Sequence, residues 1–339
     1  MSDIISNKGG GNPPIDGYRR KIDYLRISVT DRCNLRCTYC MPEEGMPLIS
    51  HDDIMHFEEI ELLVRAAVSI GFKKVRLTGG EPLVRRGIVD LVAILRGIDG
   101  IEDLSMTTNG VLLKEMAGDL KEAGIGRINI SLDTLRRDRF REITRRDFFD
   151  SVMGGIDEAL AVGMDPVKLN VVLIKGVNDN EVTDFIEMTR DLPLSVRFIE
   201  FMPASRESDW TREKIIPLET LISEIEKEYP LTPVSERLGA GPSVDYRAAD
   251  FKGTIGFITP VSNHFCSECN RIRVTSEGRI RTCLFSNTES NVLPLLRGGK
   301  DETEIGKFIL ETLKTKPYRH DINGVQFRSC QRSMSKIGG

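Results

Sequence analysis

Short apolar runs alternate with longer amphipathic stretches along residues 24–229 of the chain. The short runs are rich in β-branched residues, which predicts strands, and the longer stretches repeat apolar residues at helical spacing, which predicts helices. The expected strands are residues 24–29, 74–78, 103–107, 127–132, 167–174 and 196–201. The expected helices are residues 57–70, 84–96, 112–123, 149–162, 180–190 and 218–228.

Six strand–helix units in a row predict a parallel sheet with helices outside it. A complete barrel of this kind has eight units, so six form either an open partial barrel or a doubly wound sheet. Polar segments follow four of the strands, at the end where barrel enzymes carry their active sites; they are residues 78–82, 107–110, 131–133 and 200–203. Glycine and asparagine can also simply end a strand. Four coincident cases favour an α/β fold with an incomplete (β/α)6 TIM-type barrel.

The alternation stops after Pro230. Residues 238–242 have the composition of a loop, and residues 253–259 predict one further strand. We therefore expect three parts: a disordered lead-in at residues 1–17, a partial barrel at 18–230, and a C-terminal region at 231–339 that covers the open side of the barrel. The lead-in is assigned because residues 1–15 are polar and contain three consecutive glycines and two consecutive prolines.

Composition and charge add limits rather than a function. Hydrophobic residues make up 40% and charged residues 29% of the 339, as in ordinary globular proteins. The net charge of −4 gives no overall attraction to nucleic acid or to a membrane surface, so an anionic ligand needs a local basic cluster. No apolar run approaches the roughly 18 residues of a membrane span, and the N-terminus lacks the apolar core of a signal peptide. We expect a cytoplasmic protein.

Seven cysteines are distributed as two tight groups and one isolated residue, Cys330. An odd count without a secretion signal argues against a disulfide framework, and triplets at short spacing indicate metal binding. The first triplet is Cys33, Cys37 and Cys40, directly after the first strand. Three thiolates can hold a [4Fe–4S] cube and leave one iron open for a small molecule, because such clusters usually have four cysteine ligands. Structural zinc is the alternative, although no histidine follows closely to complete four ligands.

The second triplet is Cys266, Cys269 and Cys283. It predicts a second cluster in the C-terminal region, with zinc completed by His264 as the alternative. Arg271 and Arg273 follow at alternate positions, so on an extended segment they share a face and can grip a polyphosphate. A solvated basic edge is the other interpretation of these two arginines.

Further basic residues occur inside the predicted barrel strands. Lysine and arginine are rarely buried unless they are paired, so their presence there indicates an anionic ligand in the interior. Salt bridges to Glu200 or Asp133 are the structural alternative. The residues concerned are Arg26, Lys74, Arg76, Lys168 and Arg197.

The C-x3-C-x2-C spacing, with Tyr39 before the last cysteine and Gly-Gly-Glu-Pro after the second strand, resembles the radical S-adenosylmethionine superfamily. The resemblance implies that S-adenosylmethionine binds the open iron and is cleaved to a 5′-deoxyadenosyl radical that removes a substrate hydrogen atom. It also implies that Gly79, Gly80 and Glu81 meet the methionyl amino group and that Ser131 reaches the carboxylate. The expected contacts on the adenine side are Met202 and the Tyr39 backbone.

Within that superfamily the chain resembles the GTP 3′,8-cyclase family of molybdenum cofactor biosynthesis from about residue 18 to its end. The segments that carry the resemblance are residues 25–33, 75–82, 197–202 and 266–283 and the final Gly338-Gly339. Residues 41–56 look short for the family. The resemblance implies two [4Fe–4S] clusters and GTP as substrate, with 3′,8-cyclo-7,8-dihydro-GTP as product. The implied GTP-binding residues are Arg26, Lys74, Arg76, Thr107, Lys168, Arg197, Arg271, Ile272 and Arg273.

The same resemblance implies that Gly338, Gly339 and Arg26 support catalysis, with the tail reaching the active site. Terminal glycines suit this because backbone without Cβ atoms can enter a narrow space; a frayed end is the alternative. Expected partners are cyclic pyranopterin monophosphate synthase downstream, an unidentified electron donor and a second copy in a homodimer. The competing interpretations are another radical S-adenosylmethionine enzyme with an auxiliary cluster, acting on peptides or tetrapyrroles, and an electron-transfer or scaffold protein.

Overall fold

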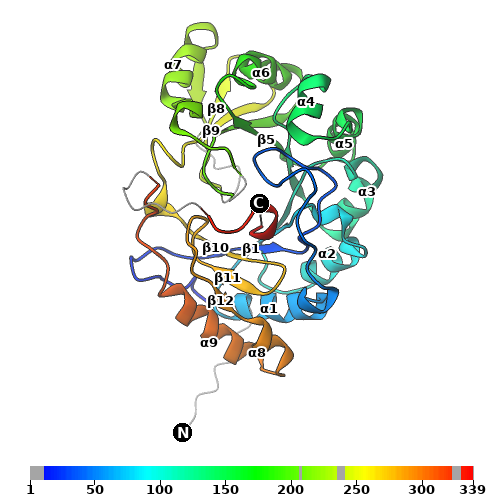
Figure 1. Ribbon diagram of the computed structural model, residues 1–339, viewed down its shortest axis with the longest axis vertical. Helices are drawn as coiled ribbons and strands as arrows, with labels where there is room; N and C mark the ends of the chain where they lie inside the picture. Colours follow the sequence, from blue (N-terminus) through cyan, green and yellow to red (C-terminus); the bar gives the residue numbers. More distant parts are fainter. Residues whose placement is uncertain (1–10, 206–207, 235–240, 323–329, 339) are drawn as a thin grey trace.

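The computed structural model describes residues 11–205, 208–234, 241–322 and 330–338. All six predicted strands are confirmed within one or two residues, as β1 Tyr24–Ser28, β2 Lys74–Thr78, β3 Asp103–Thr108, β4 Arg127–Ser131, β5 Val167–Leu173 and β6 Leu194–Glu200. The six predicted helices are confirmed as α1 Phe57–Ser69, α2 Ile88–Arg96, α3 Leu113–Ala123, α5 Phe149–Ala161, α6 Val182–Asp191 and α7 Leu218–Glu228. The strands form a ring with helices outside it, and the red segment that ends at residue 338 lies inside the ring (Figure 1).

One helix in the barrel region was not predicted from the sequence. α4 spans Arg137–Thr144, and most of its residues are charged. Only Phe140, Ile143 and Thr144 are buried, which is too short an apolar stripe to stand out as helical periodicity. Short 3-10 helices occupy His51–Asp53, Pro82–Val84, Asp179–Glu181, Arg212–Lys214, Cys266–Glu268 and Met334–Lys336.

The C-terminal region extends the sheet at both edges. Its elements are β7 Leu231–Pro233, β8 Val244–Ala248, β9 Thr254–Ile258, β10 Arg271–Val274, β11 Arg279–Arg281, β12 Ser290–Asn291, α8 Leu293–Arg297 and α9 Glu302–Leu313. β9 pairs in parallel with β6, and β10 pairs in parallel with β1. The strand order is β12-β11-β10-β1-β2-β3-β4-β5-β6-β9-β8-β7. The expected α/β fold is therefore confirmed, and the C-terminal region lengthens the partial barrel as well as approaching its open side.

Alternation along the strands separates the hydrophobic core from the interior of the ring. Leu25 and Ile27 of β1 are fully buried in the core, with the apolar faces of the outer helices, whereas Arg26 between them lines a cavity inside the ring. On the neighbouring strands, Arg76 and Arg273 are in register with Arg26 and line the same cavity. The core thus holds the backbone of each strand in place, while the inward positions are left for polar chemistry.

Part of the expected disordered lead-in is ordered. Residues 1–10 lie outside the described residues, but Ile15 forms a β-bridge with Lys21, and Asp16 forms a buried ion pair with Arg20 at 2.6 Å. Arg20 also donates to the backbone oxygen of Cys266 at 2.8 Å. The prediction of disorder up to residue 17 is therefore wrong for residues 14–17, because this long-range contact holds them. No helix in the described ranges has the length and apolar character needed to cross a membrane.

Candidate active site

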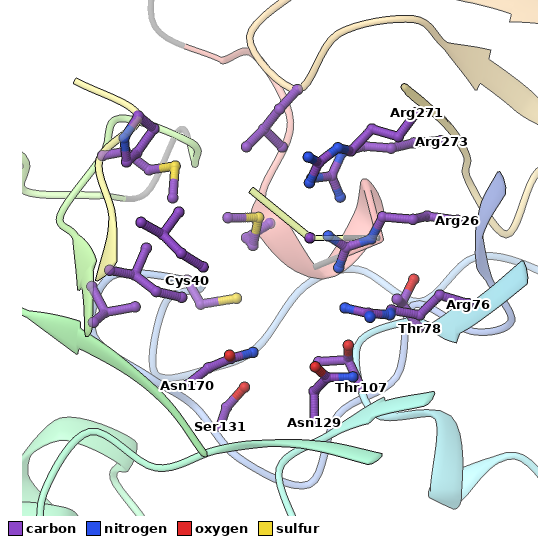
Figure 2. A pocket seen from close by; sticks show the side chains of 18 of the residues that line it. Arg26, Cys40, Arg76, Thr78, Thr107, Asn129, Ser131, Asn170, Arg271 and Arg273 are labelled. Carbon is purple, nitrogen blue, oxygen red and sulfur yellow. The ribbon is translucent and has the colours of Figure 1, made fainter. Parts of the chain in front are cut away.

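One cavity of about 340 Å³ lies inside the ring and brings most of the predicted site residues together. Both cysteine triplets line it, as do the segments that follow β2, β3 and β4. Figure 2 shows arginines on one wall, with their guanidinium groups directed into the cavity, and amide and hydroxyl side chains on the floor. The predicted residues that line it are Arg26, Cys33, Cys37, Tyr39, Cys40, Arg76, Gly79, Gly80, Glu81, Thr107, Ser131, Arg197, Met202, Cys266, Cys269, Arg271, Arg273 and Cys283.

The loop that carries the first triplet is held by the two glycines after β2. The amide of Gly80 donates to the oxygen of Thr30 at 2.7 Å, and the amide of Glu81 donates to the oxygen of Arg32 at 2.8 Å. A Cβ atom on Gly80 would lie 2.3 Å from the Arg32 oxygen, and one on Gly79 would lie 2.8 Å from the Thr30 oxygen. Glycine is therefore required here to let the cysteine loop pack against β2, a reason that the sequence did not reveal.

Glu81 joins the ends of β2 and β3. Its buried carboxylate accepts hydrogen bonds from Thr108 Oγ1 at 2.7 Å, from the Asn109 amide at 2.6 Å and from the Leu83 amide at 3.0 Å. Burial raises the pKa of Glu81 to about 7 in spite of these three donors. Asn109 in turn approaches Cys33 Sγ with its side-chain amide at 3.8 Å. Glu81 therefore fixes the surroundings of the first triplet.

Burial disfavours the thiolate form of the three cysteines in the first triplet. It raises the pKa of Cys33 to about 11 and that of Cys40 to about 12, and it raises the pKa of Cys37 well above its ordinary value. Tyr39 donates to Asp133 at 2.5 Å, and burial raises the pKa of this carboxyl group to about 6. Thiolates here therefore need a bound cation to stabilise their charge.

The second triplet lies in a cationic setting. Lys316, only 3% exposed, donates to Cys269 Sγ at 3.3 Å, to the Arg271 oxygen at 2.9 Å and to the Thr282 oxygen at 2.6 Å. Burial raises the pKa of Cys269, but Lys316 and Arg271 outweigh it and bring that pKa down to about 7. Lys316 thus ties β10, on which Arg271 lies, to the segment that carries Cys283.

Three arginines lie side by side across three parallel strands. Arg26 of β1 is in register with Arg273 of β10 on one side and with Arg76 of β2 on the other. Burial lowers the pKa of all three groups, and that of Arg273 falls to about 10. Cations gathered in this way repel one another, so a bound polyanion would stabilise the wall.

Two more cations lie on the opposite strands. Burial, with Arg197 and other arginines nearby, lowers the pKa of Lys168 to about 6. Arg197 forms a buried ion pair with Asp245 of β8 at 3.1 Å. A Cβ atom at Gly256 would lie 2.3 Å from Asp245 Oδ1, so glycine at this position leaves room for the pair. The structural alternative considered for strand cations, a salt bridge, is therefore correct for Arg197, with Asp245 rather than Glu200 or Asp133 as its partner.

Three predicted GTP-binding residues do not line the cavity. Lys74 is paired with Asp23 at 2.7 Å, so its ammonium group is engaged elsewhere. The side chain of Ile272 lies in the hydrophobic core because it alternates with Arg271 and Arg273 on β10. Lys168 is buried beside the cavity rather than in its wall.

The described part of the C-terminal tail enters the ring. Gly338 is buried with φ +76°, and its backbone oxygen accepts a hydrogen bond from Arg273 Nη1 at 2.7 Å. A Cβ atom there would lie 2.9 Å from Thr78 Oγ1. Met334 lines the cavity. Gly339, also predicted to support catalysis, lies outside the described residues.

Several cavity residues were missed from the sequence. Asn129 and Asn170 lie at inward positions of β4 and β5, where an asparagine between apolar residues was a detectable signal. His320 also lines the cavity, with its ring 5.0 Å from that of Phe285. No local pattern distinguished His320 or Lys316. His264, considered as a zinc ligand, is not among the lining residues.

The donor sets fit iron–sulfur clusters with one open iron each. Each triplet presents three thiols to one cavity, and polar groups that could bind ligands of the clusters surround the space between them. In the described part of the chain, no three histidine, cysteine, aspartate or glutamate side chains are close enough together to hold a single metal ion.

Comparison with known proteins identifies the class. The model of the radical SAM superfamily matches residues 27–189, and the model described as Molybdenum Cofactor Synthesis C matches residues 194–322. Streptococcus suis SuiB has a similar fold, with a TM-score of 0.55 at 17% identity over 88% of this chain and 66% of that one. SuiB bound to its precursor peptide SuiA gives a TM-score of 0.57 at 16% identity over 89% of this chain and 67% of that one.

Curated relatives define the family. GTP 3′,8-cyclases from Moorella thermoacetica and Geobacter sulfurreducens are each 48% identical to this chain over 96% of its length and 99% of theirs. The enzyme from Pelotomaculum thermopropionicum is 49% identical over the same shares. The chain belongs to the GTP 3′,8-cyclase family of radical SAM enzymes. Membership confirms the predicted cofactors, S-adenosylmethionine and [4Fe–4S] clusters, for which both cysteine triplets are present.

Proposed function

We propose that this chain converts GTP into 3′,8-cyclo-7,8-dihydro-GTP. The observation that supports this best is one cavity that joins two cysteine triplets to a wall of arginines. S-adenosylmethionine, held at a cluster on the first triplet, would supply a 5′-deoxyadenosyl radical able to take the hydrogen at ribose C3′ as 5′-deoxyadenosine, so that C3′ could bond to guanine C8. The cyclised nucleotide would then need one electron, from an external donor, and one proton to become the closed-shell product. The second triplet would hold the guanine base.

The arginine wall binds and orients the triphosphate. Arg271 and Arg273 project from β10, and Arg26 and Arg76 continue the wall across β1 and β2. Planar guanidinium groups suit bidentate contacts with phosphate oxygens. Thr107 at the end of β3 binds the ribose. Arg197, paired with Asp245, lines the cavity from the far strands, and Lys168, whose pKa is lowered to about 6, would regain its proton beside a bound polyanion. Lys74, paired with Asp23, is left out of this proposal.

S-adenosylmethionine occupies the side of the cavity near the first triplet. Gly79, Gly80 and Glu81 meet its amino group, and Ser131 meets its carboxylate. The adenine lies against Met202 and the Tyr39 backbone. All six residues line the cavity, which supports the assignment.

The tail positions the reacting groups and excludes water. Gly338 contacts Arg273, and Arg26 lies next to Arg273 in register. We propose that Gly338, Gly339 and Arg26 support catalysis in this way. Deleting Gly338 and Gly339 then leaves iron content and GTP binding largely unchanged and abolishes cyclisation, because small misplacements of reacting atoms are costly. Full product formation by the truncated enzyme would contradict the assignment.

The product is passed to a cyclic pyranopterin monophosphate synthase, and an external donor supplies electrons. A homodimer, a cytoplasmic location and a domain boundary near residue 230 stay predictions.

The decisive experiment is an anaerobic assay of reconstituted protein with GTP, S-adenosylmethionine and a reductant. We expect 5′-deoxyadenosine and a product with the mass of GTP, identified by mass spectrometry and NMR. ATP in place of GTP is the matched control and should give no cyclised product. Release of 5′-deoxyadenosine that GTP does not stimulate, together with unchanged GTP, would favour the alternative radical SAM enzymes.

A further inference from the structure

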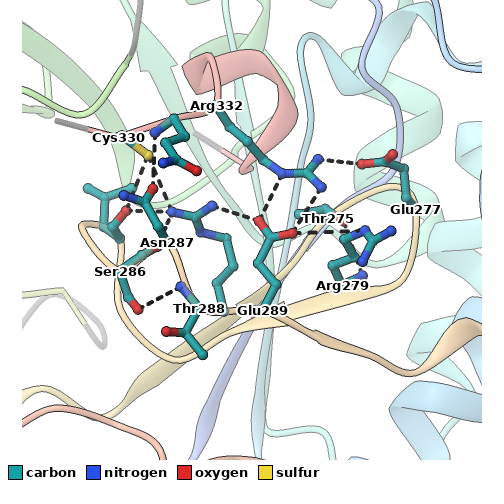
Figure 3. A network of polar contacts seen from close by, with 12 residues as sticks. Thr275, Glu277, Arg279, Ser286, Asn287, Thr288, Glu289, Cys330 and Arg332 are labelled. Carbon is teal, nitrogen blue, oxygen red and sulfur yellow. Dashed lines mark hydrogen bonds and ion pairs between the residues drawn. The ribbon is translucent and has the colours of Figure 1, made fainter. Parts of the chain in front are cut away.

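The tail that enters the cavity is attached at its base by a network of charges that the proposed function leaves unexplained. Arg332 forms ion pairs with Glu277 and with Glu289, the latter at 2.8 Å. Its side chain is 23% exposed, and those of Glu277 and Glu289 are 24% and 12% exposed. Figure 3 shows Arg332 between the two carboxylates. One tail arginine therefore bridges two acidic groups on either side of β11.

Glu289 is shared with a second, deeper arginine. Arg281 is 1% exposed and forms an ion pair with Glu289 at 2.7 Å. Its other terminal nitrogen donates to the backbone oxygens of Leu284 and Ser286. Leu284 directly follows Cys283, so Arg281 organises the turn that carries this cluster ligand. Through Glu289, the tail and the Cys283 turn share one network.

Cys330 belongs to the same network. It is 1% exposed, lies 3.3 Å from Arg281 Nη2 and 3.9 Å from the Leu284 oxygen, and does not line the cavity. The seventh cysteine thus packs the base of the tail against the Cys283 turn, which accounts for its isolation from both triplets.

Beyond Arg332 the tail crosses to the first triplet and ends on the arginine wall. The Met334 amide donates to Ser205 Oγ at 3.3 Å, and this hydroxyl donates to the Cys40 oxygen at 3.0 Å. Gly338 then accepts from Arg273 at 2.7 Å. Residues 330–338 therefore touch the turn of Cys283, the loop of Cys40 and the arginine wall in succession.

Among the described tail residues 330–338, only Arg332 forms ion pairs. A partly buried arginine shared by two carboxylates is a directional attachment, which adds to the buried side chain of Ile337 and to the bond from Arg273 to Gly338. Removing it leaves Glu277 and Glu289 without one cation, but Arg281 still neutralises Glu289. The fold should therefore survive the loss of Arg332 better than the loss of Arg281.

We propose that Arg332 is a positioning residue that anchors the tail on the turn of Cys283 and so fixes Gly338 against Arg273. This rests on the proposed function for its catalytic consequence, but the anchoring itself does not. Arg332 acts through the tail backbone, without touching substrate or cofactor. The anchor links the two cysteine groups mechanically, because the tail segment 330–338 contacts both the turn of Cys283 and the loop of Cys40.

The experiment compares Arg332→Ala with Arg332→Lys and with Arg137→Ala. Arg137 is the matched control, since it also pairs with two carboxylates, Asp147 and Asp150, but on the exposed surface away from the cavity. Amide hydrogen exchange of residues 333–338 should accelerate at least about 10-fold in Arg332→Ala, in line with local opening of a chain end. Arg332→Lys should restore part of the protection, and Arg137→Ala should match wild type.

Turnover is measured on the same three variants. Arg332→Ala should keep its iron content and GTP affinity and lose at least about 10-fold in cyclised product per 5′-deoxyadenosine formed, because an unfixed tail misplaces the reacting groups. Unchanged exchange at residues 333–338 would overturn the anchor. Faster exchange with an unchanged product ratio would overturn the positioning role. If wild type forms no cyclised product, the proposed function fails, and the exchange result still decides the anchor.

Discussion

The two cysteine triplets present the same number of thiols to one cavity in different electrostatic surroundings. The first lies beside the buried carboxyl groups of Glu81 and Asp133, and burial raises the pKa values of all three of its thiols. In the second, burial raises the pKa of Cys266, but Lys316 and Arg271 lower that of Cys269 to about 7. The spacing of cysteines therefore specifies a metal cluster, whereas the neighbours decide what that cluster can bind.

This difference matches the two proposed ligands. Hydrogen-bond acceptors near the first triplet suit the amino group of S-adenosylmethionine, and cations near the second suit a nucleoside triphosphate.

Removing each triplet separately should abolish product in both cases but for different reasons. Cys33→Ser, Cys37→Ser and Cys40→Ser together should eliminate 5′-deoxyadenosine and keep about four of roughly eight irons per chain. The corresponding triple variant at Cys266, Cys269 and Cys283 should keep about the same iron and still cleave S-adenosylmethionine slowly without cyclising GTP. Iron analysis and chromatography measure both quantities. Stoichiometric zinc and no iron after anaerobic handling would contradict the comparison.

The arginine wall should govern nucleotide affinity, and Arg273 should also affect the position of the tail. Arg271→Ala should weaken GTP binding by about 2–5 kcal/mol, roughly 30-fold to several-thousand-fold, because a buried phosphate contact is lost. Arg273→Ala should do the same and also release Gly338, so it should lower the product ratio further. Calorimetry measures the affinity, with Arg137→Ala as the control. Wild-type affinity in the Arg271, Arg273 double variant would refute the assignment.

Lys168 should lower the stability of the ligand-free protein and strengthen the binding of GTP. An unfolded lysine keeps its proton up to about pH 10.4, whereas the folded group, with its pKa lowered to about 6, releases it above that value. Between these values the unfolded state binds more protons, so the stability of the ligand-free protein rises with pH. Lys168→Met should remove that rise.

At pH 7 the same variant should melt about 2–4 °C higher for each kcal/mol relieved, and it should bind GTP more weakly. Thermal unfolding between pH 6 and 9, without and with GTP, measures both effects. A variant that is less stable than wild type throughout this range would show that the contacts of Lys168 outweigh the cost of burying its ammonium group.

Lys316 should produce the smallest change. Lys316→Met removes a hydrogen bond and a positive charge from Cys269, so the reduction potential of the second cluster should become more negative while that of the first stays unchanged. Loss of iron to a chelator should accelerate about 10-fold, as is usual for a partner of a metal ligand. Redox titration followed by EPR distinguishes the two clusters. An equal shift in both would remove the electrostatic distinction between them.

The features that could be predicted from the sequence are those that depend on residues a few positions apart. Apolar periodicity fixed the six strands and six helices of the barrel region, and cysteine spacing with the Gly-Gly-Glu-Pro segment indicated the cofactors. Parity along a strand correctly placed Arg271 and Arg273 on one face and, read the same way, would have placed Ile272 in the core. These features depend on residues a few positions apart, so a single chain carries the signal.

Only the tertiary structure decided how distant segments meet. The pairing of β10 with β1 sets Arg273 beside Arg26, although about 250 residues separate them. No local sequence pattern indicates the ion pairs of Lys74 with Asp23, of Arg197 with Asp245 or of Arg332 with two carboxylates. A charged residue looks the same in the sequence whether it contacts solvent, substrate or a partner side chain. Which cations face the cavity is therefore a property of strand order and register, which emerge only when the whole sheet has formed.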